Sequence, residues 1–270
     1  MLHWANSLEK GVFSIKSSQR SSKHITHNRL KYLEIKPETK EVAPLLLDNL
    51  TLPSLTRFSY HVFIHDFNNP FPTKAFISFL RRSQISILQE FEIKAGNSWM
   101  MDEYLFRILR SLPPIRRLSL VCYPISMKLL WLGNDFFSKF AQILISHFPG
   151  LEELHLNVPN PLPFSWNIFL GFLESTYASF LDAPSSSNSA NQKSSLRTHI
   201  NIRLYIQLSA KASPPYIEAS VASQLANSDW NHFLSLKVLD KMKGTDLVQD
   251  SLSFIRRRKG RVQASVASAS

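Results

Sequence analysis

The residues best placed for specific chemistry are charged and polar side chains that alternate with apolar ones in short segments. Ten of them occupy the x positions of one pattern, apolar-x-x-apolar-x-apolar. They are Tyr32, Glu34, Arg57, Glu90, Glu92, Arg116, Arg117, Glu152, Glu153 and His155. Carboxylates mixed with guanidinium groups suit ion pairs and hydrogen bonds to a protein partner. Mixed charge is also ordinary solvated surface, so both interpretations stay open.

Recognised signatures of catalysis are missing from the sequence. It contains none of the patterns G-x-S-x-G, G-x-x-x-x-G-K-[ST], H-E-x-x-H and G-x-G-x-x-G. The single cysteine, Cys122, follows a predicted strand, where we expect a buried thiol rather than a nucleophile. The sequence therefore predicts neither an enzyme nor a bound cofactor.

The most metal-like cluster consists of His61, His65 and Asp66. In an extended chain, four residues separate the two imidazoles by about 13 Å, which is too far for one ion. A surface loop is therefore favoured over a metal site. His24 and His27, in the Ser-rich N-terminal segment, make no stronger case, and we expect no metal.

The segments that must position the polar side chains recur along the chain. Copies of the pattern begin at Leu30, Leu55, Leu88, Ile115, Leu151 and Phe233. An alternating apolar stretch, at residues 200–208, lies in the long gap before the last copy. Within each copy the last two apolar side chains share one face of a strand, and polar residues point the other way. We expect one buried and one wet face.

Helix-periodic segments separate these strands, at residues 42–50, 74–82, 102–111 and 135–147. Pro53, Pro113 and Pro149 precede three of the strands and stop the helices before them. One strand and one helix cannot bury their apolar faces alone, so neighbouring units must stack. The pattern predicts an α/β leucine-rich-repeat solenoid of about six to seven irregular repeats, with short parallel strands on the concave side and helices outside. An ordinary α/β domain would instead have strands that are apolar on both faces.

Three segments resemble the leucine-rich-repeat region of fungal, basidiomycete-type F-box proteins. They are Leu-Thr-Leu-Pro-Ser-Leu at 50–55, Phe-Leu-Arg-Arg-Ser at 79–83 and Leu-Pro-Pro-Ile-Arg-Arg-Leu-Ser-Leu at 112–120. The resemblance covers residues 30–157 and implies substrate recognition for a ubiquitin ligase. Residues 1–29 contain no recognisable F-box, the segment that docks on a Skp-type adaptor, so an adaptor is implied by family analogy alone. The chain is expected to begin inside the family's architecture, as a fragment or truncated product would.

The formal net charge of +11 is concentrated at the two ends of the chain. Residues 1–29 hold five basic residues and one acid, and residues 256–261 hold five more basic residues. The nearly neutral body between them disfavours a nucleic-acid-binding fold, which carries its charge on a folded face. The run at 256–259 is either a nuclear-localisation or nucleic-acid patch, or the charged end of a terminal helix predicted at 246–258.

The sequence thus predicts five regions. They are a basic Ser-rich segment or degenerate edge repeat at 1–29, leucine-rich repeats at 30–182, a low-complexity insertion at 183–195, degenerate repeats at 196–258, and a frayed tail at 259–270. No apolar run approaches the roughly 18 residues of a membrane span, and no secretory signal is evident. We expect an intracellular protein of the cytoplasm or nucleus that contacts no membrane. Its predicted function is a protein-interaction scaffold, the substrate-recognition part of an F-box-type receptor without its F-box. The alternative is a nucleic-acid-associated or nuclear protein that uses its basic termini.

Overall fold

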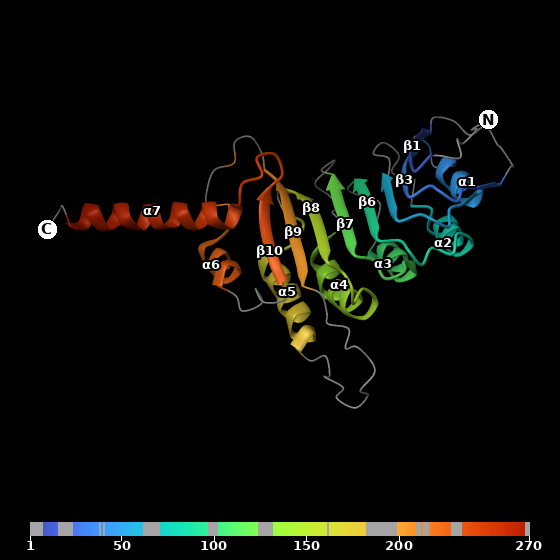
Figure 1. The fold of residues 1–270 in the computed structure, drawn as a ribbon. Coiled ribbons are helices and arrows are strands. Elements are labelled where there is room, and N and C mark those ends of the chain that lie inside the picture. The colour runs from blue at the N-terminus through green and yellow to red at the C-terminus, as the bar shows by residue number, and fades with distance from the viewer. Residues whose placement is uncertain are drawn as a thin grey trace, which may run out of the picture.

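The chain forms an α/β structure built on a parallel sheet (Figure 1). The computed structural model describes residues 8–15, 24–37, 39, 41–61, 71–96, 102–123, 132–160, 162–181, 199–208, 212, 216–227 and 234–267. Its strands are β1 Lys10–Ile15, β2 Ile25–Thr26, β3 Tyr32–Pro37, β4 Leu50–Thr51, β5 Arg57–His61, β6 Glu90–Gly96, β7 Arg117–Tyr123, β8 Glu153–Pro159, β9 Ile200–Gln207 and β10 Leu234–Asp240. Its helices are α1 Val42–Asp48, α2 Thr73–Arg82, α3 Asp102–Ser111, α4 Asn134–His147, α5 Trp166–Leu181, α6 Ala219–Asn227 and α7 Leu247–Ala267.

Eight strands make one sheet in the order in which they follow along the chain. The order is β1-β3-β5-β6-β7-β8-β9-β10, and every neighbouring pair is parallel. The short strands β2 and β4 form a separate parallel pair. From β5 to β10, the chain leaves each strand and returns through a helix to the next position in the sheet (Figure 1). The α/β class and the parallel strands predicted from the sequence are confirmed.

The register lines up apolar residues across the sheet and buries them. One aligned row consists of Leu33, Phe58, Phe91, Leu118, Leu154 and Ile202, each at most 1% exposed. In β3 and β8 buried residues alternate with partly exposed ones along the strand. The prediction of strands with one buried and one wet face therefore holds for β3 and β8, whereas in β5 and β7 Ser59, Ser119 and Val121, on the face expected to be wet, are also buried.

The entry to each strand is joined to the preceding unit by the same pair of backbone hydrogen bonds. The N–H groups of Thr56 and Arg57 both donate to the carbonyl of Lys31, at 2.8 and 2.9 Å. Gln89 and Glu90 donate in the same way to Thr56, at 2.8 and 3.0 Å. Three more junctions repeat the arrangement, namely Lys31 and Tyr32 to Glu9, Arg116 and Arg117 to Gln89, and Glu152 and Glu153 to Arg116. Successive units therefore stack by one rule from β1 to β8.

Aromatic side chains link consecutive helices beneath the sheet. Phe136 of α4 stacks on Phe106 of α3, with ring centroids 5.5 Å apart. On its other side α4 meets α5, where Phe137 lies edge-on to Phe169 at 5.3 Å. All four rings are at most 4% exposed. Each helix therefore buries its apolar face against its neighbours in the stack, as the stacking of units requires.

The Arg-Ser pair that ends α2 ties this helix to the preceding unit. Arg82 Nη2 donates a hydrogen bond to the carbonyl of Leu47 at the end of α1. Ser83 is fully buried, and its Oγ accepts a 2.9 Å hydrogen bond from the N–H of Leu52. At the end of α4, His147 Nε2 lies 2.9 Å from the carbonyl oxygen of Leu112. The Arg-Ser motif thus satisfies backbone groups that would otherwise be buried without partners.

The C-terminal region differs from the sequence prediction in two respects. The gap before β9 and the segment before β10 contain helices, α5 and α6, that were not predicted as separate elements. The last helix does not end near Arg258 but continues to Ala267 and extends away from the body (Figure 1). Residues 262–267 are Val-Gln-Ala-Ser-Val-Ala, whose Ala and Gln have good helix propensity and prolong it.

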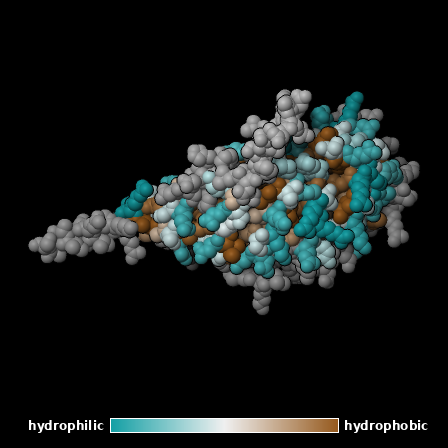
Figure 2. Space-filling model, turned by 90° about the horizontal axis from the view of Figure 1, so that it is seen from below, coloured by the Kyte–Doolittle hydropathy of each residue, from teal (hydrophilic) through white to brown (hydrophobic). Residues whose placement is uncertain are grey.

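The surface seen from below mixes hydrophilic and small hydrophobic areas, without one large hydrophobic patch among its coloured residues (Figure 2). Of the helices in the described ranges, none combines the length and apolarity needed to traverse a bilayer. The predicted insertion at 183–195 lies outside the described residues. The boundaries predicted at 1–29, 30–182, 196–258 and 259–270 stay predictions.

Candidate functional site on the open face of the sheet

Two aligned rows of mostly polar strand residues make up the surface that we call the open face. The first row is Lys10, Tyr32, Arg57, Glu90, Arg117, Glu153, Asn201 and Ser235. The second row, two residues further along each strand, is Val12, Glu34, Ser59, Glu92, Ser119, His155, Arg203 and Lys237. Parallel in-register pairing places the members of each row side by side.

Eight of the ten candidate residues belong to these rows. Tyr32, Arg57, Glu90, Arg117 and Glu153 are in the first row, and Glu34, Glu92 and His155 are in the second. Arg116 and Glu152 immediately precede their strands instead. Arg116 Nη1 lies 3.6 Å from Glu152 Oε1, and the Arg116 side chain is largely exposed while that of Glu152 is about half exposed. These two candidates therefore form an ion pair where the strands begin, outside the two rows.

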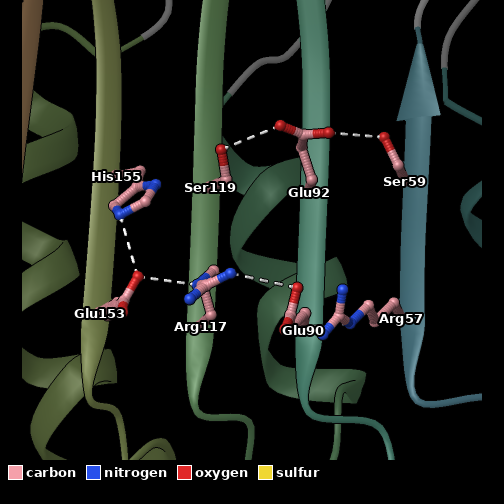
Figure 3. Close-up of polar contacts among 8 residues, drawn as sticks. All are labelled: Arg57, Ser59, Glu90, Glu92, Arg117, Ser119, Glu153 and His155. Atoms are coloured by element: carbon pink, nitrogen blue, oxygen red, sulfur yellow. Dashed lines mark hydrogen bonds and ion pairs between the residues drawn. The ribbon is translucent and has the colours of Figure 1, made fainter.

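The first row forms a chain of alternating cations and anions (Figure 3). Arg57 Nε lies 3.1 Å from Glu90 Oε1, and Arg117 Nη1 lies 3.4 Å from Glu90 Oε2. Arg117 Nε is also 2.8 Å from Glu153 Oε2, and His155 Nε2 approaches the same oxygen at 3.2 Å. The contact with Arg117 lowers the pKa of Glu153 against the opposing effect of burial. Both carboxylates are therefore neutralised by residues of neighbouring strands.

Glu92 is the centre of the second row. Its Oε2 accepts a 2.7 Å hydrogen bond from the Ser59 hydroxyl, and its Oε1 accepts one of 3.2 Å from Ser119 (Figure 3). Lys94 Nζ lies 2.8 Å from Glu92 Oε2. Ser59 and Ser119 are 2% and 9% exposed, and sequence reasoning did not select them. The available signal was their position in the pattern, two residues after Arg57 and Arg117.

Glu34 is a carboxylate of the open face with three side-chain contacts. Its Oε2 accepts a 2.7 Å hydrogen bond from the Tyr32 hydroxyl, and its Oε1 lies 3.0 Å from Lys36 Nζ and 2.8 Å from His61 Nε2. Burial raises the pKa of Glu34, but the contacts with Tyr32 and Lys36 and the charge of His61 outweigh it and lower that pKa to about 2. Burial and the nearby Lys94 lower the pKa of His61. At neutral pH Glu34 is therefore ionised beside a neutral imidazole.

A hollow of about 430 Å³ lies between the two rows, from β1 to β8. Its residues are Lys10, Tyr32, Arg57, Phe58, Ser59, Glu90, Phe91, Glu92, Arg117, Ser119 and His155. Burial lowers the pKa of His155, against the opposing charge of Glu153. The hollow therefore presents a set of hydrogen-bond donors and acceptors in which Arg57, Glu90, Glu92 and Arg117 each lie close to a group of opposite charge, while Lys10 lies over the ring of Tyr32.

The remaining residues considered in the sequence analysis are the histidines, Asp66 and Cys122. His61 contacts Glu34, whereas His65 and Asp66 lie outside the described residues. No group of three potential metal ligands is found within the described ranges. Cys122 is 1% exposed, which confirms the predicted burial. His27 is also buried, and its Nδ1 accepts a 3.0 Å hydrogen bond from the N–H of Leu30.

Comparisons with protein-family models, with curated proteins and with solved structures found no match.

Proposed function

We propose that the chain is a protein-binding scaffold of the leucine-rich-repeat type, and that its partner lies across the open face. Support for the repeat architecture comes from the sheet order, which follows the chain without exchange of strands. The paired hydrogen bonds onto Glu9, Lys31, Thr56, Gln89 and Arg116 recur at equivalent points of successive units. Together with the sequence pattern, they fit about six to seven irregular repeats with the strands on the concave side.

The observation that carries the proposal is the row of alternating charges beside the hollow. Neighbouring strands are about 4.8 Å apart, so a partner lying across them meets one or two side chains from each unit. Arg57 and Arg117 offer guanidinium groups, and Glu90 offers a carboxylate between them. A surface of both signs suits the mixed charges of a protein segment, whereas the phosphates of a nucleic acid require a basic one.

Within this proposal, the chain is the substrate-recognition part of an F-box-type ubiquitin-ligase receptor. Support comes from the resemblance at 50–55, 79–83 and 112–120, and from the contacts of Arg82 and Ser83 that hold this part of the stack together. A Skp-type adaptor follows from the family analogy. The proposed location is the cytoplasm or nucleus, where such ligases act.

The second candidate function is association with nucleic acid through the basic termini. The observation that favours it is the exposure of Arg256 and Arg257 on α7. These cations lie outside the sheet, so the two functions use different residues and separate variants distinguish them.

The test is affinity purification from the source cells with the full chain and two charge-matched double variants. We expect Arg57→Glu with Arg117→Glu to lose the captured protein, and Arg256→Glu with Arg257→Glu to keep it. Circular dichroism and thermal melting identify any variant that is unfolded. The opposite result, with binding that also falls steeply as salt rises, would replace this proposal with the nucleic-acid function. Absence of Skp and cullin from the captured proteins would remove the ligase role.

A further inference from the structure

A second candidate binding surface is a groove between α2 and α3. Lys74 and Arg81 line it from α2, and Arg107 and Arg110 line it from α3. Lys139 of α4 completes a set of five cations, and the groove is open to solvent with a volume of about 1230 Å³. We call this surface the basic groove. It is separate from the open face, since no residue lines both.

Helix geometry brings these side chains to one side of each helix. Lys74 and Arg81 are seven residues apart, or two turns of α2. Arg107 and Arg110 are three residues apart, so they are neighbours on the surface of α3. The opposite sides of both helices are buried, with Phe76 and Phe79 of α2 and Ile108 of α3 fully enclosed. The cations are therefore held facing outward by the packing of the apolar sides.

The cations of the basic groove differ from those of the open face in their pairing. Within the described ranges, none of the five forms an ion pair or donates a side-chain hydrogen bond to the protein. Glu103 is the single acid that lines the groove. Arg57 and Arg117, by contrast, each contact carboxylates across the sheet. The basic groove therefore has positive charge available to a ligand.

The size and lining of the groove indicate the kind of ligand. The volume exceeds the roughly 300–1,000 Å³ of small-molecule pockets. Each helix has ten residues and is about 15 Å long, which matches three turns of a helical segment. Ile77 and the 46%-exposed Tyr104 lie among the cations and provide apolar contact area. Cations around an apolar strip complement a protein segment that carries both acidic and apolar side chains.

We propose that the basic groove binds an acidic, amphipathic protein segment of a partner, with carboxylates on the arginines and an apolar side chain beside Tyr104. The chain itself has no acidic run that would serve, because its longest runs of consecutive acids are the pairs at 102–103 and 152–153. A nucleic acid or a lipid surface shares the negative charge, and both are tested as outcomes below. The scaffold thus has two faces of different chemistry, one mixed and one basic.

The probe is a fluorescent peptide of about ten residues, with Leu and Phe spaced three or four residues apart on one helical face and Glu and Asp on the other, titrated with the full chain. We expect the triple variant Arg81→Glu, Arg107→Glu, Arg110→Glu to weaken binding by about tenfold or more. The matched control is Lys243→Glu, Arg256→Glu, Arg257→Glu, which changes the net charge by the same amount at exposed positions elsewhere. It should leave the affinity within about twofold, because charges beyond a Debye length are screened. Tyr104→Ala should weaken binding without any change of charge.

Four results would overturn the proposal. The first is that the acidic peptide does not bind, and the second is that a peptide with Gln and Asn in place of Glu and Asp binds equally well. The third is that the two triple variants lose affinity equally, and the fourth is that Tyr104→Ala does not weaken binding. Tighter binding of single-stranded DNA of similar charge would identify a nucleic-acid site, and binding to phosphatidylserine vesicles would identify a lipid site. The peptide and these variants test the basic groove and not the open face. A negative result therefore does not decide the proposed function, which is tested separately by the variants of the open face.

Discussion

The Ser59 hydroxyl donates a 2.7 Å hydrogen bond to Glu92 across the boundary between β5 and β6. Ser119 donates to the other carboxylate oxygen from β7, so Glu92 connects three consecutive strands. The same carboxylate lies close to Lys94. Because its oxygens are already engaged, Glu92 fixes the geometry of the open face.

Replacing Glu92 by Ala should lower the free energy of unfolding by about 1–3 kcal/mol, because it leaves the nearly buried Ser59 and Ser119 hydroxyls without their acceptor. Urea unfolding at neutral pH measures the change. Glu152→Ala is the control, since its ion pair with Arg116 is exposed and should contribute about 0–1 kcal/mol. Equal losses in the two variants would contradict the central role of Glu92.

Ser83→Ala should cost about 1–3 kcal/mol of stability, because the buried N–H of Leu52 loses its acceptor. We expect the midpoint of urea unfolding to fall, while the dependence of the unfolding free energy on urea concentration stays unchanged. Ser86→Ala, at an exposed position three residues later, should change the stability by less than about 0.5 kcal/mol. If Ser83→Ala behaves like Ser86→Ala, the contact between α2 and the preceding turn is not stabilising.

Stability should fall as the pH is lowered from 7. Burial lowers the pKa of both His61 and His155 below the ordinary 6.5, so the unfolded chain binds protons first and stability declines from about pH 6.5 downward. The pKa of Glu34 is lowered from 4.5 to about 2, so its contribution is complete above 4.5 and is lost as the pH falls toward 2.

Glu34→Gln separates the two effects. It should flatten the loss of stability below pH 4.5 and leave a decline near pH 6.5, because His155 still titrates. Urea unfolding of both proteins across the pH range measures this. An unchanged slope below pH 4.5 would show that the pKa of Glu34 is not lowered.

Phe136→Ala should cost about 3–5 kcal/mol, because the fully buried ring joins α3 to α4 and its removal leaves a cavity. Ile87→Ala, at a 46%-exposed side chain, should cost under about 1 kcal/mol. Units of a stack contact only their neighbours, so the loss should appear as weaker coupling between the two halves and a broader unfolding transition. A small, uniform shift of the transition would contradict this.

Seven strands, β3 and β5 to β10, and four helices could be predicted because their apolar residues follow a clear period, and the start of α7 was also predicted, whereas β1, β2 and β4 were not. The third predicted helix, Asp102–Ser111, has the observed bounds. The helix α5 could not be predicted, because its apolar residues follow one another almost without interruption and obscure the period of 3.6 residues. They are Ile168, Phe169, Leu170, Phe172 and Leu173. The helix α6 is rich in Ala and Ser and has few large apolar residues to mark a face.

The sequence could predict which face of its strand each candidate residue occupies, but not which residues contact one another. Period-two alternation places Glu34, Glu92 and His155 on the wet face of their strands. The observed register pairs equivalent positions of successive copies, as a stack of repeats implies, but the pattern does not specify which neighbour each side chain contacts. Glu34 is aligned with Ser59 and yet contacts His61, two residues further along the adjacent strand.

The identical junctions onto Lys31, Thr56 and Gln89 make the units of this stack interchangeable at their ends. If residues 56–88 were removed, Gln89 and Glu90 would take the places of Thr56 and Arg57. Their N–H groups would then donate to the carbonyl of Lys31, and the carbonyl of Gln89 would still accept from the next strand. Each unit added or removed would change the width of the open face by about 4.8 Å and leave the other junctions as they are. The open face of such a protein can therefore widen or narrow by whole units, so that gene duplication and deletion can alter its width without redesigning the core.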